Sequence, residues 1–458
     1  MTTELHDIIN PATEKVIAQI PSAGVAETDE AVARAVRAQR TWREVAPADR
    51  GRLLRRFAEE VDRDVDRLAE LEVANAGHTI GNARWEAGNV RDVLTYYAAA
   101  PERLFGRQIP VAGGLDLTFK EPIGVVGIIV PWNFPMPIAG WGFAPALAAG
   151  NSVVLKPAEL TPLTALRLGE LALAAGIPEG VLQILPGRGA VAGARLVEHP
   201  DVRKIVFTGS PAVGRQVMAG CAKQVKAVTL ELGGKSANIV FADSDLEQAA
   251  ATAPGAVFDN AGQDCCARSR ILVEASAYDR FMELLETAVG GFAVGDPSLD
   301  ETQMGPLISA GHRDRVSAYV TEQTPVAFRG IAPQGPGYWF PPTVLSPAGG
   351  AQDRSCPAYT EEVFGPVVSV VRFADEADAI RIANDSEFGL SGSIWTRDLG
   401  RALRTGRAVE AGNLSVNSHS SVRYATPFGG YKQSGLGREL GPDALDAFTE
   451  TKNIFIAY

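Results

Sequence analysis

The chain has 458 residues, of which 46% are hydrophobic and 21% charged, and its formal net charge is −11. This length predicts two or three domains of a soluble globular enzyme, while the negative charge argues against a broad nucleic-acid surface. No apolar run is long enough to cross a bilayer, and the N-terminal residues lack the basic and apolar regions of a signal peptide. Four cysteines in so long a chain indicate no disulfide framework. We therefore expect a cytoplasmic protein with reduced thiols and no membrane partner.

Helical and strand-like segments alternate along the chain. Residues 27–75 carry apolar side chains three and four positions apart, which predicts helices. Further helices are expected at 135–149 and 161–176. Short β-branched runs that close in Gly- or Pro-rich turns predict strands at 124–133, 151–158, 180–187, 202–210 and 227–234.

A second α/β region is expected from about residue 235 to 430, with strands at 270–275, 367–374, 389–396 and 412–418. Two more predicted strands, 115–122 and 451–458, stand apart from both regions. The alternation of strands and helices predicts parallel sheets with helices on both faces. Ligands of such folds bind beyond the carboxyl ends of the strands.

Two segments could hold a nucleotide, although no G-x-G-x-x-G motif opens a helix. In "FTGSPAVG" (207–214) a strand leads through a turn into a helix, whose N-terminal N–H groups suit a pyrophosphate. In "LKPAE", Lys156 and Glu159 follow a strand, where a carboxylate could accept hydrogen bonds from both ribose hydroxyls. It would repel a 2′-phosphate, which favours NAD over NADP. Each segment alone is also compatible with an ordinary turn or solvated charges.

The sequence "GQDCCARSR" (262–270) places two cysteines side by side. Either could be a nucleophile once deprotonated, whereas a zinc site is disfavoured because adjacent cysteines rarely reach one ion and the five histidines are scattered. Glu231, at a strand end before two glycines, could act as a general base. Asn133, in "VPWNFP", could donate to an oxyanion. For both residues the alternative is a purely structural role in a turn.

Seven motifs occur in order along nearly the whole chain: "PWNFP", "LKPAEL", "FTGS", "LELGGKS", "GQDC", "EEVFGPV" and "PFGGYKQSGLGRELG". In this combination the chain resembles the aldehyde dehydrogenase superfamily, in its hydrolytic branch, and especially the amino- and betaine-aldehyde dehydrogenases of bacteria. The resemblance implies a Rossmann-type NAD-binding domain (1–103 and 123–233), an α/β catalytic domain (234–433) and an oligomerisation arm (104–122 and 434–458). It therefore implies a homodimer or homotetramer. Residues 319–345 are shorter than in most relatives, which predicts a trimmed surface loop.

The resemblance also implies roles for individual residues. Cys265 matches the nucleophile, Glu231 the general base and Asn133 the oxyanion donor, which acts together with the Cys265 backbone N–H. The positions that match contacts to NAD are Trp132, Lys156, Glu159, Gly189, Gly193, Phe207, Gly209, Ser210, Glu362 and Phe364. The implied reaction oxidises an aldehyde to a carboxylic acid through a thiohemiacetal and a thioester on Cys265. Glu231 favours water over coenzyme A as the acyl acceptor.

The identity of the aldehyde is open. Residues expected near it are Phe134, Trp141, Asp264, Cys266, Arg423, Tyr424 and Phe428. Asp264 stands where relatives usually carry an apolar residue or a cysteine, which favours a cationic aminoaldehyde or betaine aldehyde, unless it faces solvent or pairs with Arg268. Arg423 favours succinate semialdehyde instead, and aromatic or aliphatic aldehydes remain alternatives.

Two other classes of function are compatible with such a fold. A non-catalytic binding protein is opposed by the joint presence of Cys265, Glu231 and Asn133. A thiol hydrolase without cofactor is opposed by the lack of a histidine placed to activate the thiol.

Overall fold

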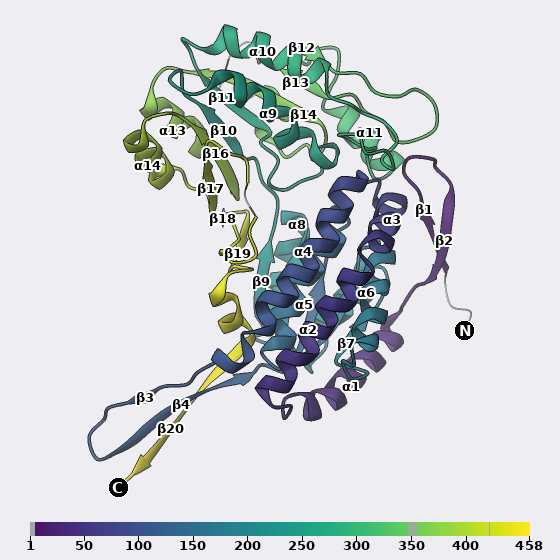
Figure 1. Cartoon of the computed structure of the whole chain (residues 1–458), viewed down its shortest axis with the longest axis vertical. Helices are drawn as coiled ribbons and strands as arrows, with labels where there is room; N and C mark the ends of the chain where they lie inside the picture. Colours follow the sequence, from purple (N-terminus) through teal and green to yellow (C-terminus); the bar gives the residue numbers. More distant parts are fainter. Residues whose placement is uncertain (1–4, 348–349, 351–354, 421) are drawn as a thin grey trace.

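The computed structural model describes residues 5–347, 350, 355–420 and 422–458. Its three larger sheets have six, seven and three strands (Figure 1). The six-stranded sheet and its helices form the lower body of the view, the seven-stranded sheet lies above it, and the three-stranded sheet projects as an arm at the lower left. The two bodies therefore meet along an edge, and this edge is where the predicted site residues gather.

The six-stranded sheet has the order β19-β9-β8-β5-β6-β7, and its strands run parallel except β19. The strands are β5 (Val125–Ile129), β6 (Ser152–Lys156), β7 (Leu182–Ile184), β8 (Val202–Thr208), β9 (Ala227–Glu231) and β19 (Gly435–Leu436). Every residue of β5 and β6 is buried, as expected for central parallel strands that are covered on both faces.

Alternating side chains of β5 explain the two layers of helices. Val126 and Ile128 belong to a core shared with α2 (Pro47–Arg63), α4 (Ile80–Ala98), α5 (Pro135–Ala148) and α6 (Leu163–Ala174). Val125 and Ile129 point to the opposite face, into a core shared with α1 (Val25–Trp42), α7 (Ala194–Glu198) and α8 (Pro211–Ala222). A further helix, α3 (Val65–Ala76), packs on α4.

The seven-stranded sheet has the order β12-β13-β14-β11-β10-β16-β17 and is parallel except for β12. Its strands are β10 (Ala237–Val240), β11 (Arg270–Glu274), β12 (Val326–Arg329), β13 (Thr343–Leu345), β14 (Val367–Phe373), β16 (Ser391–Trp395) and β17 (Asn413–Val416). Its helices are α9 (Leu246–Phe258), α10 (Tyr278–Gly290), α11 (Ala310–Ala318), α12 (Pro357–Thr360), α13 (Glu376–Asn384) and α14 (Leu399–Ala408). Among all the helices described, none is both long and apolar enough for a membrane span.

The arm and two small hairpin-like pairs complete the fold. In the arm, β4 (Gly114–Pro122) lies between β3 (Gln108–Ile109) and β20 (Thr449–Ala457) and pairs antiparallel with both. The small pairs are β1 (Leu5–Ile9) with β2 (Val16–Pro21), and β15 (Phe388–Gly389) with β18 (Tyr431–Lys432). The chain therefore reaches the arm twice, once between α4 and β5 and once at its C-terminal end.

The α/β class predicted from the sequence is confirmed, and each predicted strand overlaps an observed one. The sequence patterns missed β10, α4 and the β1–β2 pair. The expected surface loop at 319–345 instead contains β12 and β13, which pair at the edge of the seven-stranded sheet. Gly435–Leu436, assigned to the arm, pairs with β9 of the six-stranded sheet. The domain boundaries stay a prediction.

Asn151 joins three parts of the lower body. Its side-chain nitrogen donates to the carbonyl oxygens of Ala146 (3.0 Å) and Phe448 (2.9 Å), and its oxygen accepts from the Gly124 N–H (2.9 Å). The side chain is buried, so no water can replace these partners.

We expect Asn151→Ala to lower the free energy of unfolding by about 2–4 kcal/mol, because three backbone groups lose a buried partner. Urea denaturation followed by tryptophan fluorescence measures the shift in midpoint. Gln19→Ala, which removes an exposed hydrogen bond to Asp7, should leave the midpoint unchanged. Equal midpoints for both variants would contradict this role of Asn151.

Candidate active site

The strand ends of the two bodies meet where the backbone after β9 comes very close to the segments that lead into β11 and β14. β9 ends at Glu231, and the glycines that follow it touch the segments leading into β11 and β14. The Gly234 N–H donates to a Glu362 oxygen at 2.7 Å, and a Cβ on Gly234 would stand 2.1 Å from the Cys265 carbonyl oxygen. A Cβ on Gly233 would stand 2.3 Å from Glu362. A side chain at position 234 would collide with backbone, so glycine is required there, whereas a side chain at position 233 would displace the Glu362 carboxylate that binds the Gly234 N–H.

The segment before Cys265 is a tight turn of unusual backbone conformation. Asn260, Ala261 and Gly262 all have positive φ angles (49°, 54° and 70°), which non-glycine residues rarely adopt. Hydrogen bonds from Gln263 hold the turn: its amide nitrogen donates to the Asn260 carbonyl (3.0 Å), and its amide oxygen accepts from the Ile308 N–H (2.8 Å). Gln263 of the "GQDC" motif is thus a structural support of the cysteine loop.

Asn133 is bound directly to this turn. Its side-chain nitrogen donates to the Gln263 carbonyl at 3.0 Å, and the Asn260 side chain donates back to the Asn133 carbonyl at 2.7 Å. Asn133 follows β5, so these bonds fix the end of a strand in one sheet against the cysteine loop of the other. One N–H of the Asn133 amide is used in this contact, and an amide nitrogen carries two.

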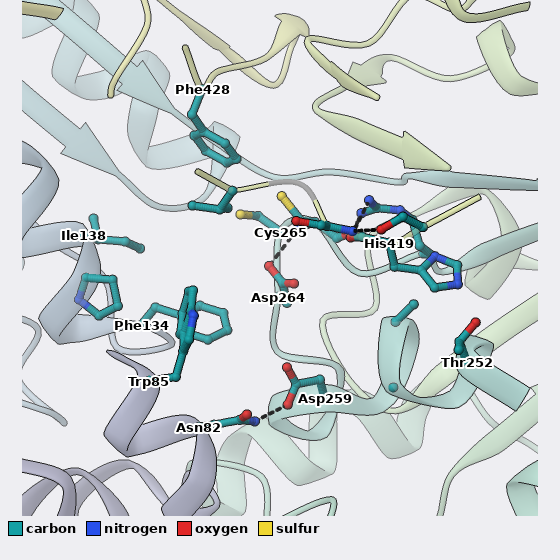
Figure 2. A pocket seen from close by; sticks show the side chains of 18 of the residues that line it. Asn82, Trp85, Phe134, Ile138, Thr252, Asp259, Asp264, Cys265, His419 and Phe428 are labelled. Carbon is teal, nitrogen blue, oxygen red and sulfur yellow. Dashed lines mark hydrogen bonds between the residues drawn. The ribbon is translucent and has the colours of Figure 1, made fainter. Parts of the chain in front are cut away.

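One cavity of about 640 Å³ brings Cys265 and Glu231 together, a size typical of a pocket for a small molecule. Figure 2 shows Asp264 and Cys265 on one side of this cavity and Phe134 and Ile138 on the other. Other lining residues include Trp85, Trp141, Asp259, Cys266, Arg268, His419, Phe428 and Glu439. Thiol and carboxylate, 34 positions apart in the sequence, therefore share one space.

Aromatic rings form much of the cavity wall. Trp141 of α5 packs on Phe428, with ring centroids 5.3 Å apart, and its indole N–H donates to Asn89 at 2.8 Å. Since its polar atom already has a partner, Trp141 presents an apolar surface to the cavity. Phe134 adds a third ring. This wall suits an apolar substrate, or a cation held over aromatic faces.

Acidic side chains also face the cavity. Asp264 accepts a hydrogen bond from the Cys266 N–H at 2.8 Å, and Asp259 accepts one from Asn82 (Figure 2). Burial raises the pKa of Asp264, and burial together with the charge of Asp264 raises the pKa of Asp259 to about 6. Arg268 is the buried cation nearby; it donates to Ser393 (2.8 Å) and to the Cys266 carbonyl.

The surroundings of Cys265 and of Glu231 favour the neutral form of each group. A hydrogen bond with the Cys266 side chain, and then burial, raise the pKa of the Cys265 thiol well above its ordinary value. Burial and the charge of Glu439 raise the pKa of Glu231 well above that of a solvated carboxyl. Burial likewise raises the pKa of Glu439 to about 7. The two buried carboxyls therefore titrate as a pair, as like charges in one site must.

The predicted nucleotide segments lie beyond β6 and β8. Lys156 is buried; its ammonium donates to the carbonyls of Pro157 (2.8 Å) and Gly187 (3.0 Å), and burial lowers its pKa to about 8. The Gly189 N–H donates to Glu159 at 2.5 Å. A Cβ on Gly193 would contact the Lys156 side chain at 3.4 Å. The two predicted ribose contacts and the two glycines predicted to lie under the adenine therefore form one group.

Beyond β8, Ser210 caps α8. Its hydroxyl accepts from the Val213 N–H at 3.4 Å. Gly209 donates its N–H to the Glu231 carbonyl at 3.0 Å, and a Cβ there would meet the Phe207 ring at 2.6 Å. This turn thus lies between the α8 N-terminus, which favours an anion, and the strand that ends in Glu231.

Phe364, two positions after Glu362, lies beside Trp132. Burial raises the pKa of Glu362 to about 7. Phe364 has a positive φ of 57°, and its ring packs edge-on against Trp132, with centroids 5.4 Å apart. His312 donates to the Phe364 carbonyl at 2.7 Å and packs on Trp132, so it supports this aromatic corner. With the α8 N-terminus and the carboxylate Glu159, these residues supply the donors, acceptors and flat walls that a dinucleotide needs.

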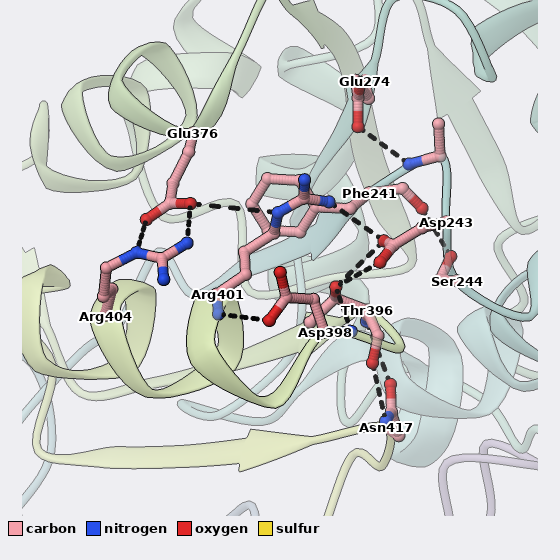
Figure 3. A network of polar contacts seen from close by, with 11 residues as sticks. Phe241, Asp243, Ser244, Glu274, Glu376, Thr396, Asp398, Arg401, Arg404 and Asn417 are labelled. Atoms are coloured by element: carbon pink, nitrogen blue, oxygen red, sulfur yellow. Dashed lines mark hydrogen bonds and ion pairs between the residues drawn. The ribbon is translucent and has the colours of Figure 1, made fainter.

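Polar residues at the carboxyl ends of β10 and β16 have a different use (Figure 3). Thr396 and Arg401 both donate to Asp243, at 2.9 and 3.1 Å, and Arg404 makes a two-pronged contact with Glu376. The charges are matched within the network. It fastens α13 and α14 to the sheet.

Two residues predicted near the substrate lie elsewhere. Arg423 and Tyr424 are exposed, and the Tyr424 ring packs on Tyr96 with centroids 5.6 Å apart. Neither lines the cavity, although their neighbours Val422 and Phe428 do. Conversely, sequence reasoning missed several residues that the fold brings to the site: Trp85, Asp259, Asn260, His419 and Glu439. Of these, Asp259 and Asn260 gave a signal as polar residues just before the "GQDC" motif, and Glu439 lies within the motif "PFGGYKQSGLGRELG".

Comparison with known proteins agrees with this geometry. The model of the family described as "Aldehyde dehydrogenase family" matches residues 2–454. An aldehyde dehydrogenase of Emericella nidulans is 41% identical over 98% of this chain and 90% of its own length. The structure of PnpE from Pseudomonas sp. WBC-3 is 41% identical, with a TM-score of 0.95 over 99% of this chain and 94% of that chain.

The structure of betaine aldehyde dehydrogenase from Staphylococcus aureus, in complex with NAD⁺, is 36% identical with a TM-score of 0.95, over 99% of this chain and 91% of that chain. The family match covers nearly the whole sequence, and it includes every residue that lines the cavity. The chain therefore belongs to the aldehyde dehydrogenase family.

Proposed function

We propose that this aldehyde dehydrogenase oxidises its aldehyde to the free carboxylic acid with NAD, through a covalent intermediate on Cys265. The observation that carries this proposal is the shared cavity of Cys265 and Glu231, with Asn133 bound to the cysteine loop. The overall reaction converts aldehyde, NAD⁺ and water to carboxylic acid, NADH and a proton.

The first half of the reaction belongs to Cys265 and Asn133. The Cys265 sulfur adds to the aldehyde carbon while the thiol proton passes to the carboxylate form of Glu231, which shares the cavity and returns the proton to solvent before the second half. The oxyanion that forms accepts from the second Asn133 N–H and from the Cys265 backbone N–H, which are held in place before the reaction begins. NAD, when bound by Glu159, Glu362 and the α8 N-terminus, supplies the acceptor for the hydride of the thiohemiacetal carbon.

The second half belongs to Glu231. The thioester left on Cys265 is attacked by water, whose proton passes to the Glu231 carboxylate. The carbon–sulfur bond then breaks, and the acid leaves as the thiolate is released. A raised pKa makes Glu231 a stronger base than a solvated carboxylate, and the charge of Glu439 contributes to this shift.

Preference for NAD over NADP follows from Glu159. A ribose 2′-phosphate beside this carboxylate would meet a like charge, whereas a 2′-hydroxyl can donate to it. The NAD complexes of PnpE and of the Staphylococcus aureus enzyme support NAD as the cofactor.

The cavity favours a cationic or neutral aldehyde over an acidic one. Asp264, Asp259 and Glu439 face it, and Arg268 is already engaged by neighbouring carbonyl and hydroxyl groups. Arg423, the basis for a succinate-semialdehyde alternative, lies outside the cavity. An aminoaldehyde or betaine aldehyde is therefore the preferred substrate class.

The arm supports assembly into a homodimer or homotetramer. β20 is the edge strand of its sheet and exposes Ile454, Phe455 and Ile456. Apolar edge strands readily pair with a second chain.

We expect purified wild-type protein to form NADH with NAD and betaine aldehyde or an aminoaldehyde, and to respond less to NADP. Cys265→Ala should abolish this activity, since the covalent step requires sulfur. Cys221→Ala, which removes a buried thiol from α8, should retain it. Ester cleavage without NADH from any aldehyde would instead indicate a thiol hydrolase.

Glu231→Gln should form one equivalent of NADH rapidly and then stall at the thioester. The steady-state rate should fall by roughly 10²–10⁴, the usual contribution of a general base. In the wild type, the steady-state rate should rise with pH beyond the range of ordinary carboxyls, because the raised pKa of Glu231 delays formation of its base form. Stopped-flow absorbance measures the burst, and exposed Glu70→Gln is the control. An undiminished steady state would exclude Glu231 as the base.

Asp264→Asn should raise KM for betaine aldehyde roughly tenfold, which corresponds to about 1.4 kcal/mol of lost charge attraction. KM for neutral benzaldehyde should change little, and this comparison within one variant separates substrate charge from effects on Cys265. Equal changes for both aldehydes would count against a cation site at Asp264.

A further inference from the structure

Three side chains that can ligate a metal ion lie together outside the cavity. Glu72 belongs to α3, His78 to the turn after it and Glu86 to α4. His78 Nδ1 lies 2.5 Å from a Glu86 oxygen and 3.7 Å from a Glu72 oxygen. One possible ligand atom of each residue lies within 4.8 Å of those of the other two. None of the three residues lines the cavity of Cys265, and the mechanism proposed above does not use them.

Both carboxyl groups of this group are buried, and most of their oxygens are not satisfied. Glu72 and Glu86 are 0% exposed and His78 is 2% exposed. Within the described part of the chain, both oxygens of Glu72 and one oxygen of Glu86 have no hydrogen-bond partner. A buried carboxylate is costly unless a counter-charge or a metal ion compensates it. A cation bound between the three residues would account for these oxygens.

The separations within the group fit a single ion of the size of zinc. Zinc keeps imidazole nitrogens and carboxylate oxygens at about 2.0–2.2 Å, so two such ligands of a tetrahedral ion stand about 3.3 Å apart. The two distances from His78 Nδ1 lie on either side of this value. A small rotation of the Glu86 side chain away from His78 is enough to admit the ion. One oxygen of Glu86, both oxygens of Glu72 and the imidazole then supply the four ligands that zinc usually takes.

Charge and ligand type favour a divalent transition-metal ion at this position. Two carboxylates and a neutral imidazole together carry two negative charges, and a divalent ion cancels both. Imidazole suits zinc and iron, whereas magnesium and calcium prefer oxygen ligands. Protonation of the carboxyl groups is the other way to remove their charge, and metal analysis distinguishes the two.

The backbone between α3 and α4 is held firmly in place. Gly77 ends α3 with a φ of 78°, and a Cβ there would stand within 3 Å of both Pro11 and Pro306. The Ile80 N–H, at the start of α4, donates to the Pro297 carbonyl at 2.8 Å. The two helices also pack against each other. The possible ligands are therefore brought together by the fold and not by a flexible loop.

We propose that Glu72, His78 and Glu86 form a structural site for one divalent transition-metal ion, and that zinc is the ion that fits best. The ion joins α3 to α4 behind Phe134, whose ring packs on His78 with centroids 5.6 Å apart and lines the cavity. No step of the reaction passes through the ion, so this inference does not depend on the proposed function.

Metal analysis after dialysis against EDTA tests the proposal. Because the group is buried, we expect the folded protein to retain its ion, whereas ions on the surface or at the accessible cavity are removed. Wild-type protein from zinc-supplemented cells should hold roughly one equivalent of first-row transition metal per chain by mass spectrometry. Glu72→Gln and His78→Gln should each lower this content at least about tenfold.

A matched control locates the ion. Asp264, Cys265 and Cys266 are another set of possible ligands, and Cys266→Ala removes one of them, so this variant should keep the full metal content. X-ray absorption at the edge of the bound metal needs no variant at all. For zinc, we expect nitrogen and oxygen neighbours at about 2.0–2.2 Å and no sulfur at about 2.3 Å.

Wild-type protein without metal after dialysis would overturn the proposal and would assign protons to the buried carboxyl groups instead. Equal metal content in the wild type and in folded Glu72→Gln and His78→Gln would overturn it too, as would sulfur neighbours in the absorption spectrum. Should both variants fail to fold, the wild-type metal content and spectrum decide. Failure of the proposed function is a separate result, because it appears as a lack of NADH formation and leaves the metal content unchanged.

Discussion

The contact between the Asn133 turn and the cysteine loop is the constraint on which the active site depends. The side-chain amides of Asn133 and Asn260 bind carbonyl groups across the junction of the two bodies, and the Gln263 amide binds a carbonyl group within the cysteine loop. Each is buried, so each hydrogen bond is made with protein and costs more to lose than an exposed one. They fix the position of the predicted nucleophile relative to the predicted oxyanion donor, although the two residues follow strands of different sheets or lead into them.

Close approach of the two bodies also explains where glycine is required. Gly234 passes so close to the Cys265 carbonyl that any side chain would collide with backbone, and a side chain on Gly233 would displace the Glu362 carboxylate. The double glycine after Glu231 therefore brings the predicted base, the nucleophile loop and Glu362, a predicted NAD contact, to one junction.

Burial sets the chemistry of the cavity. Burial raises the pKa of Glu231 and of Glu439, and a hydrogen bond with Cys266 together with burial raises the pKa of the Cys265 thiol, so the cavity favours the neutral form of each group. A thiolate that existed permanently would be exposed to oxidation, and a carboxylate already ionised at low pH would be a weaker base. The cavity thus holds its reactive groups neutral, and proton transfer among them accompanies each covalent step.

Local patterns in the sequence were enough to predict the α/β class, most strands and the residues Cys265, Glu231 and Asn133, because β-branched runs, strand-end turns and ordered motifs are properties of short segments. They could not decide that Arg423 and Tyr424 lie outside the cavity that their neighbours Val422 and Phe428 line, since the direction of a side chain in an irregular segment depends on the packing around it. Nor could they assign a role to Glu439, although it lies within a quoted motif, because Glu231 stands far earlier in the sequence. Only the packing of the helices and of the two sheets brings these two buried carboxyls within charge distance, where the loss of water raises the pKa of both.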